Sequence, residues 1–152
     1  MIRLTFTCST DTLSAPRQRQ SVLDIIRRRL HSMTISGYII LLQHDVLTIL
    51  EGPEAVVEQE YDSLATTPEI KQLLLLARET IEQPCSAPGL CFVDADAQRR
   101  PDGTLPAPEQ LLGAAHLTCS ERTRRFVQEF IDGQWHHHHA DWQSPQVVHR
   151  HS

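Results

Sequence analysis

The chain has 152 residues, of which 40% are hydrophobic, and its formal net charge is −5. This length predicts one folded unit with a real core. No apolar run approaches the roughly 20 residues that span a bilayer, and the first residues lack a signal-peptide pattern, so we expect a cytoplasmic protein without membrane contact. The acidic balance argues against nucleic-acid binding, which depends on clustered Lys and Arg. Without export, the four cysteines are expected to be buried thiols rather than disulfides.

Residues 2–8 alternate apolar and polar side chains, which is the two-residue period of a strand. A helix is predicted to open at Pro16, because apolar residues then recur at three- and four-residue spacings. The opposite face of this helix carries arginines, which we interpret either as a solvated face or as a docking patch for an acidic partner. These arginines are Arg17, Arg19, Arg27, Arg28 and Arg29.

Two apolar runs, residues 35–42 and 46–50, are joined by a short polar segment and predict a buried β-hairpin. Gly52 permits a sharp exit from the second strand, and Pro53 suits the first position of a helix that continues to about residue 65. Residues 71–83 begin with leucines and then alternate, which favours a long strand and leaves a helix as the competing interpretation.

Residues 89–93 predict a fifth strand, and the polar segment 94–108 predicts an exposed connector. A short helix is expected at residues 109–116. The motif Thr118-x-x-Glu121 is typical of a capping box and opens a second helix, which ends at Gly133. The apolar stripe of this second helix consists of Phe126, Val127, Phe130 and Ile131.

The order of these elements predicts an α+β fold of the ferredoxin-like βαββαβ type. We expect a mixed five-stranded sheet with two helices on one face, plus two C-terminal helices. The right-handed crossover rule places the first and third strands side by side, so Phe6 and Thr48 are expected within reach of each other.

The hairpin carries a paired motif, with Ile35, Ser36 and Gly37 at its start and Glu51, Gly52 and Pro53 at its end. In this spacing the chain resembles the BLUF family, flavin-containing blue-light sensors of this fold. The resemblance covers about residues 2–93 and the last helix. It implies a BLUF-like domain at residues 1–95. The composition of the rest predicts a connector with C-terminal helices at 96–135 and a His-rich flexible tail at 136–152.

The resemblance also locates the residues of a flavin site. The family has a tyrosine, a glutamine and an asparagine at the positions that are Phe6, Thr48 and Leu30 here. None of these three side chains supplies a phenol or an amide. A buried flavin would leave its acceptors unpaired at roughly 1–3 kcal/mol each, so we expect a pocket filled by the protein's own side chains and no photoactive FAD.

A run of histidines is the one candidate metal cluster, since imidazoles suit Zn, Cu or Ni. The run consists of His136, His137, His138 and His139. No Cys or carboxylate completes a recognised spacing, so we interpret the run as incidental metal affinity, with a functional site as the alternative.

No nucleophile motif, P-loop or dinucleotide fingerprint is present in the sequence, so we do not expect an enzyme. The leading hypothesis is a BLUF-fold regulatory module that contacts a protein partner, with self-association expected from the family. Its expected contact surfaces are an exposed sheet face, the arginine-bearing helix and the C-terminal helices. The alternatives are an FAD-binding photoreceptor and a metal-responsive protein.

Overall fold

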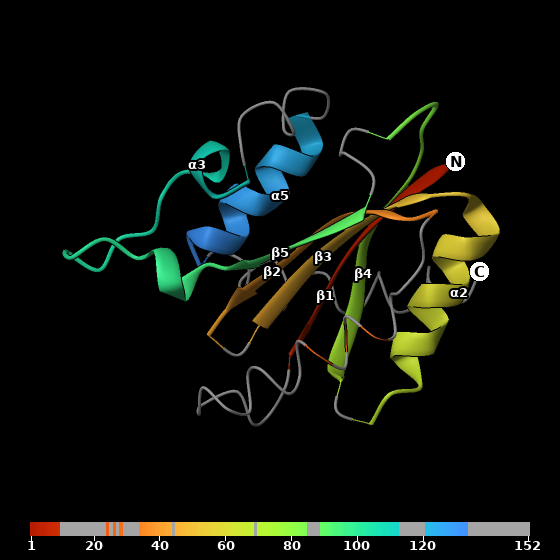
Figure 1. The fold of residues 1–152 in the computed structure, drawn as a ribbon, viewed down its shortest axis with the longest axis horizontal. Coiled ribbons are helices and arrows are strands. Elements are labelled where there is room, and N and C mark those ends of the chain that lie inside the picture. The colour runs from red at the N-terminus through yellow and green to blue at the C-terminus, as the bar shows by residue number, and fades with distance from the viewer. Residues whose placement is uncertain are drawn as a thin grey trace.

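Figure 1 shows the fold in a computed structural model of this chain. The structure describes residues 1–9, 24, 26, 28, 34–43, 45–68, 70–84, 89–112 and 121–133. The strands are β1 (Ile2–Ser9), β2 (Ser36–Leu42), β3 (Asp45–Gly52), β4 (Lys71–Thr80) and β5 (Gly89–Asp94). The helices are α2 (Glu54–Ala65), the 3₁₀ turn η1 (Asp96–Gln98), α3 (Pro108–Leu112) and α5 (Glu121–Ile131).

The five strands form one mixed sheet in the order β4-β1-β3-β2-β5. β1 lies between β3 and β4 and is antiparallel to both, while β5 runs parallel to β2. The expected α+β, ferredoxin-like architecture is therefore confirmed, including the neighbouring first and third strands. The segment with two possible interpretations, residues 71–83, forms strand β4 over Lys71–Thr80.

One face of the sheet packs against α2 and the first helix. Of that first helix, Asp24, Ile26 and Arg28 are described, and all three are helical. Ile26 is buried in the same cluster as Val57 of α2, while Asp24 and Arg28 are exposed. This face forms an apolar core. Its strand residues are Ile2, Leu4, Phe6, Cys8, Ile39, Leu41, Val46 and Leu50.

The other face of the sheet is covered by the C-terminal helices, which lie on the side opposite α2 (Figure 1). Phe126, Val127 and Phe130 of α5 are buried there, and Leu111 and Leu112 of α3 join them. The expectation of an exposed sheet face was wrong for this region. The amphipathic stripe of α5 needs an apolar surface to cover, and the sheet supplies it.

Gly37 allows β2 and β3 to approach each other closely. Its φ is +146°, and a Cβ at this position would lie 1.8 Å from the backbone oxygen of Ile49. No side chain fits in that space. The hairpin motif therefore needs its first glycine because the two strands are too close there for any other residue.

Gly52 is required because of crowding at the start of α2. A Cβ here would lie 2.9 Å from the carbonyl oxygen of Thr34 and 3.3 Å from Val57 Cγ2. Pro53 follows as the residue that precedes α2, with φ of −59°. The exit from β3 into α2 is thus as the sequence predicted, but the reason for the glycine is tight packing rather than a turn.

Several expectations concern residues outside the described ranges. These are Leu30, the capping threonine Thr118, the histidines of the tail, and four arginines of the first helix, Arg17, Arg19, Arg27 and Arg29. Gly133 is described and has φ of +77°, which is typical of the residue that ends a helix. The predicted end of the last helix is therefore confirmed.

Candidate functional site

Phe6 and Thr48 are direct partners across β1 and β3. Residues opposite each other in an antiparallel pair have their side chains on the same face, which here is the face covered by α2. Ile39 of β2 is the next residue in this row, because it pairs with Thr48 from the other side. The expectation that Phe6 and Thr48 lie within reach of each other is therefore confirmed.

The space above this row is occupied by apolar side chains. Phe6 and Ile39 are 0% exposed and Thr48 is 1% exposed. The ring of Tyr61 on α2 meets Phe6 edge to face, with ring centroids 4.9 Å apart and planes at 85°. Such aromatic pairs add about 0.5–1.5 kcal/mol to the burial of the two rings. The sequence gave no sign of this contact between Tyr61 and Phe6.

The glutamate that ends the hairpin motif has a structural partner that sequence reasoning missed. Glu51 accepts a hydrogen bond of 2.9 Å from Arg3 Nε, and its Oε2 lies 2.9 Å from Arg3 Nη2. The two side chains are 2% and 6% exposed. Arg3 also faces Glu79 of β4, with an Nη1–Oε1 distance of 3.6 Å. A buried arginine of β1 thus lies between carboxylates of the two neighbouring strands, β3 and β4.

This polar row extends across four strands on the face that the C-terminal helices cover. Ser36 of β2 pairs with Glu51, which pairs with Arg3, which pairs with Glu79 of β4. The only sequence signal for it was the polar half of the alternation in β1. That pattern is more often a solvated face, and here the row is buried because the C-terminal helices cover this face of the sheet.

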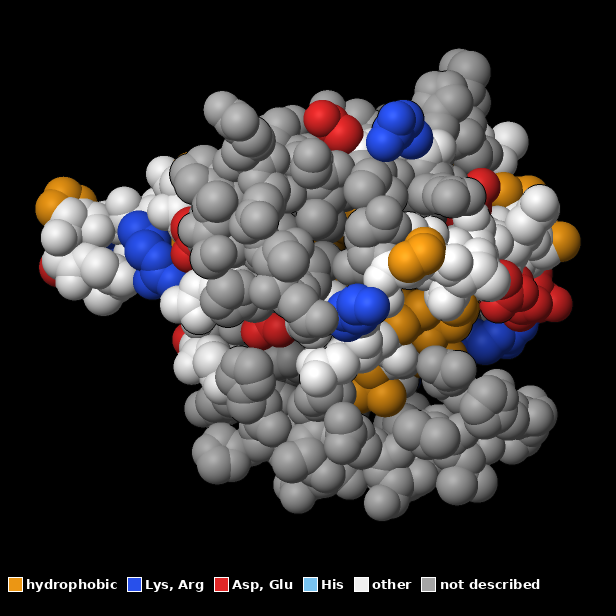
Figure 2. Space-filling view, turned by 90° about the horizontal axis from the view of Figure 1, so that it is seen from below, with side chains coloured by type: hydrophobic (Ala, Val, Ile, Leu, Met, Phe, Trp, Pro, Cys, Tyr) orange, Lys and Arg blue, Asp and Glu red, His pale blue; other side chains and the backbone are white. Residues whose placement is uncertain are grey.

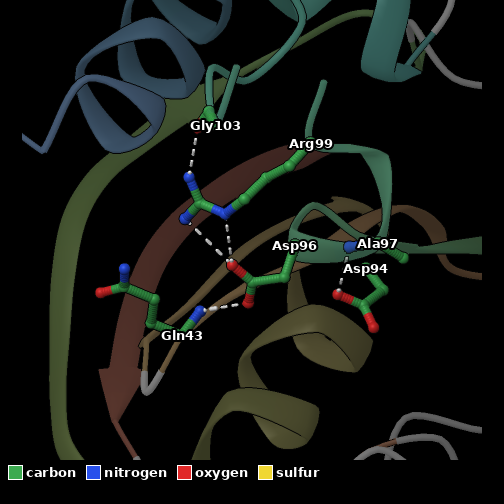
Figure 3. Close-up of polar contacts among 6 residues, drawn as sticks. All are labelled: Gln43, Asp94, Asp96, Ala97, Arg99 and Gly103. Atoms are coloured by element: carbon green, nitrogen blue, oxygen red, sulfur yellow. Dashed lines mark hydrogen bonds and ion pairs between the residues drawn. The ribbon is translucent and has the colours of Figure 1, made fainter. Parts of the chain in front are cut away.

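A second polar cluster joins the β2–β3 turn to the segment after β5 (Figure 3). Asp96 Oδ2 accepts a hydrogen bond of 2.7 Å from the backbone N–H of Gln43, a turn residue with φ of +55°. Its other oxygen accepts from Arg99 Nε and Nη2 at 3.2 and 3.1 Å. Arg99 Nη1 donates to the carbonyl of Gly103. The connector is therefore folded onto the sheet, although the sequence predicted only that it is exposed.

Acidic side chains gather on the side of the molecule where α2 lies, next to a basic one (Figure 2). Arg78 of β4 contacts Glu54 and Glu58 of α2 at 3.0 and 2.7 Å. All three side chains are at least 41% exposed, so these pairs contribute at most about 1 kcal/mol each. They are a surface feature and do not form a reactive site.

Within the described ranges, no group of three or more metal-ligating side chains is present. The predicted histidine cluster lies outside those ranges, so the metal hypothesis remains a prediction. None of the described helices has the length and apolar character needed to cross a membrane.

Comparison with known families identifies the family to which the chain belongs. The family model for sensors of blue-light using FAD, BLUF, matches residues 1–85. That is more than half of the chain, so the protein belongs to the BLUF family, and the expected resemblance is confirmed. A BLUF domain is a sensory module and is not itself catalytic. No curated protein sequence matches the chain.

Solved structures of the same fold are distant in sequence. BlrP1 of Klebsiella pneumoniae, in a manganese and cyclic-diGMP complex, has a TM-score of 0.65 at 17% identity, over 86% of this chain and 32% of that chain. This protein therefore spans about a third of that relative. The structure titled BlrP1 BLUF matches over 88% of its own length with a TM-score of 0.64 at 17% identity, over 86% of this chain. BlrB, a BLUF protein in its dark state, has a TM-score of 0.57 at 16% identity, over 84% of this chain and 94% of its own.

Proposed function

We propose that this protein is a BLUF-fold regulatory module that acts through contacts with another protein and carries no photoactive flavin. The observation that carries the proposal is the directly paired row of Phe6 and Thr48. Neither side chain supplies the phenol or the amide that the family resemblance places there.

The chemistry of FAD supports this proposal. A flavin ring presents carbonyl and nitrogen acceptors, and burying such groups without donors costs about 1–3 kcal/mol for each group. At this row a ring would meet Phe6, Ile39 and the short hydroxyl of Thr48. The residues present therefore do not fit the polar edge of the cofactor.

The packing of the apolar core is the second support. Phe6 contacts Tyr61, and Ile26 and Val57 belong to the same buried cluster. Side chains that already fill the space between sheet and helices stabilise it, and a cofactor would have to displace them. The space is thus used for packing.

The partner is proposed to be a protein. The chain is similar in fold to a bacterial light-regulated adenylyl cyclase, with a TM-score of 0.59 at 14% identity, over 94% of this chain and 36% of that chain. In such a chain the sensory fold is one part of a longer effector protein. We propose that this module contacts its effector, and further copies of itself, through the arginine-bearing helix and the outer surfaces of α3 and α5.

An absorption spectrum of the purified protein, before and after incubation with excess FAD, tests the proposal. We expect a colourless protein whose added FAD is removed completely by gel filtration. The matched comparison is the double variant Phe6→Tyr with Thr48→Gln, which restores two polar groups of the family. Stoichiometric flavin bands in the unmodified protein would overturn the proposal.

The second candidate function is an FAD-binding photoreceptor with an altered flavin pose. The observation that favours it is the family match itself, over residues 1–85. Blue-light illumination of any flavin-loaded protein distinguishes it, since a photoreceptor shifts its flavin absorption reversibly. Failure of the protein to retain FAD contradicts this candidate.

A further inference from the structure

The face of the sheet beneath α5 carries buried hydroxyl groups. Thr5 and Thr7 of β1 are 0% and 1% exposed. They lie opposite Ile49 and Leu47 of β3, which belong to the same core cluster as the apolar residues of α5. In the part of the chain that the structure describes, neither hydroxyl oxygen has a hydrogen-bond partner. We propose that α5 is a reversible cover, which leaves this face of the sheet while the strands and α2 stay folded.

An unpaired buried hydroxyl opposes the closed position of α5. A hydroxyl loses its hydrogen bonds to water when it is buried, and without a new partner this loss is not compensated. Ser36 of β2, in the polar row on the same face, adds a third such group, since its Oγ has no hydrogen-bond partner among the described residues. Water reaches these groups when α5 leaves, so release of the helix recovers part of its own cost.

The face that packs against α2 differs in this respect. Its residues on β1 are apolar or a thiol: Ile2, Leu4, Phe6 and Cys8. The described strand residues of that face include no buried polar side-chain atom without a hydrogen bond. Packing there carries no such penalty, so we expect the sheet to hold α2 more firmly than α5.

Few contacts of α5 oppose its release. Three apolar side chains hold this helix on the sheet, and its fourth buried residue is polar. These residues are Phe126, Val127, Phe130 and Thr123. An ion pair between Arg124 and Glu109 links α5 to α3, but both side chains are at least 33% exposed, and a pair at the surface contributes little.

The opening gives the protein a point of control. Release of α5 uncovers Leu47 and Ile49 beside the two hydroxyls of β1. A partner that binds the released helix, and not the docked one, shifts the protein towards the open state. This inference does not depend on whether the protein holds a flavin, because the hydroxyls lie on the face opposite the family's flavin position.

Native-state hydrogen exchange of the full chain tests the inference, followed by NMR at urea concentrations below the unfolding transition. We expect the amides of Val127 and Phe130 to be at least about tenfold less protected than those of Leu4 and Leu50 in β1 and β3. Their protection is also expected to depend less on urea, since a partial opening exposes less surface. The amide of Tyr61 in α2 is expected to follow the strands. Equal protection of α5 and the strands, or opening of α2 together with α5, would overturn the inference.

The matched variants are Thr7→Val and Thr67→Val. Thr67 is also buried, but its hydroxyl donates to the carbonyl of Ser63 at 2.9 Å. Exchange of the unpaired Thr7 hydroxyl for a methyl group is expected to raise the protection of the α5 amides by about tenfold, which corresponds to about 1.4 kcal/mol. Thr67→Val is expected to give no rise. An equal rise in both variants, or no rise in Thr7→Val, would contradict the role of the buried hydroxyls.

Discussion

Arg3 and Glu51 lie opposite each other on the neighbouring strands β1 and β3 and form an ion pair with an N–O distance of 2.9 Å. Both side chains are almost completely removed from solvent, at 6% and 2% exposure. Removing one member of a buried pair leaves the other charge without compensation, and this is much more costly than losing both. Glu51 therefore acts as the internal counter-ion of β1.

Replacement of Arg3 by Met is expected to lower the free energy of unfolding by about 3–5 kcal/mol, because Glu51 stays buried without its cation. Urea denaturation measures this change. The double variant Arg3→Met with Glu51→Leu is expected to recover most of the loss. The control is Arg78→Met, whose two exposed ion pairs predict a change of at most about 2 kcal/mol. Similar losses in the Arg3 and Arg78 variants would contradict the role of the buried pair.

Replacement of Gly37 by Ala is expected to cost about 4 kcal/mol or more, since the new Cβ would overlap the backbone oxygen of Ile49. Gly103 also has a positive φ, +88°, but has open space around it. Gly103→Ala is therefore expected to cost only about 1–2 kcal/mol, from backbone strain alone. Thermal unfolding of the two variants distinguishes the cost of atomic overlap at Gly37 from the cost of backbone strain alone at Gly103. A small effect at Gly37 would show that β2 and β3 can move apart at little cost.

Replacement of Phe6 by Tyr is expected to destabilise the protein by about 1–3 kcal/mol, because the added hydroxyl enters a closed apolar core. The comparison variant is Phe92→Tyr on β5, where the side chain is half-buried and the expected change is within about 0.5 kcal/mol. Urea denaturation with and without added FAD measures the free energy of unfolding of both variants. If FAD raised the stability of the Phe6→Tyr protein, the core would be open to the cofactor after all.

Stability is expected to fall at alkaline pH because of Cys8. Burial, with a further effect of Asp45, raises the pKa of this thiol from 9.0 to about 12. The unfolded chain therefore loses the thiol proton at lower pH than the folded protein does. The stability that the raised pKa of Cys8 contributes to the folded protein is fully present below pH 9.0. It is lost as the pH rises towards about 12.

Urea denaturation at a series of pH values, from neutral to about pH 10, checks this expectation against a Cys8→Ala variant. The variant is expected to show a shallower fall. Tyr38 is expected to cause a further loss of stability at higher pH. Its pKa is raised from 10.0 to about 12, mainly by burial and to a smaller extent by the charges of Cys91 and Glu51. Parallel pH profiles of the two proteins would show that Cys8 titrates alike in both states.

The sequence was sufficient to predict the strands whose apolar pattern is strong. The hairpin runs predicted β2 and β3, and the alternation after the leucines predicted β4. The expectation that Phe6 and Thr48 lie close together followed from the crossover rule, which depends only on the order of the strands and helices. This part of the candidate site could therefore be found without coordinates.

The sequence was not sufficient where a residue's environment depends on a distant segment. Thr5 and Thr7 alternate with apolar neighbours and indicate a solvated face, yet they are 0% and 1% exposed. The helix that covers this face lies more than a hundred residues further along the chain. Gly37 likewise needs its crowding partner, Ile49, to be known before its role is visible.

The row formed by Ser36, Glu51, Arg3 and Glu79 has a consequence for folding fidelity. Since successive residues of a strand point to opposite faces, slippage of β1 by one position would carry Arg3 into the apolar core beside α2. The same shift would leave Glu51 facing a hydrocarbon side chain. Misaligned sheets are thus penalised along this row of four strands once the helices cover the two faces of the sheet.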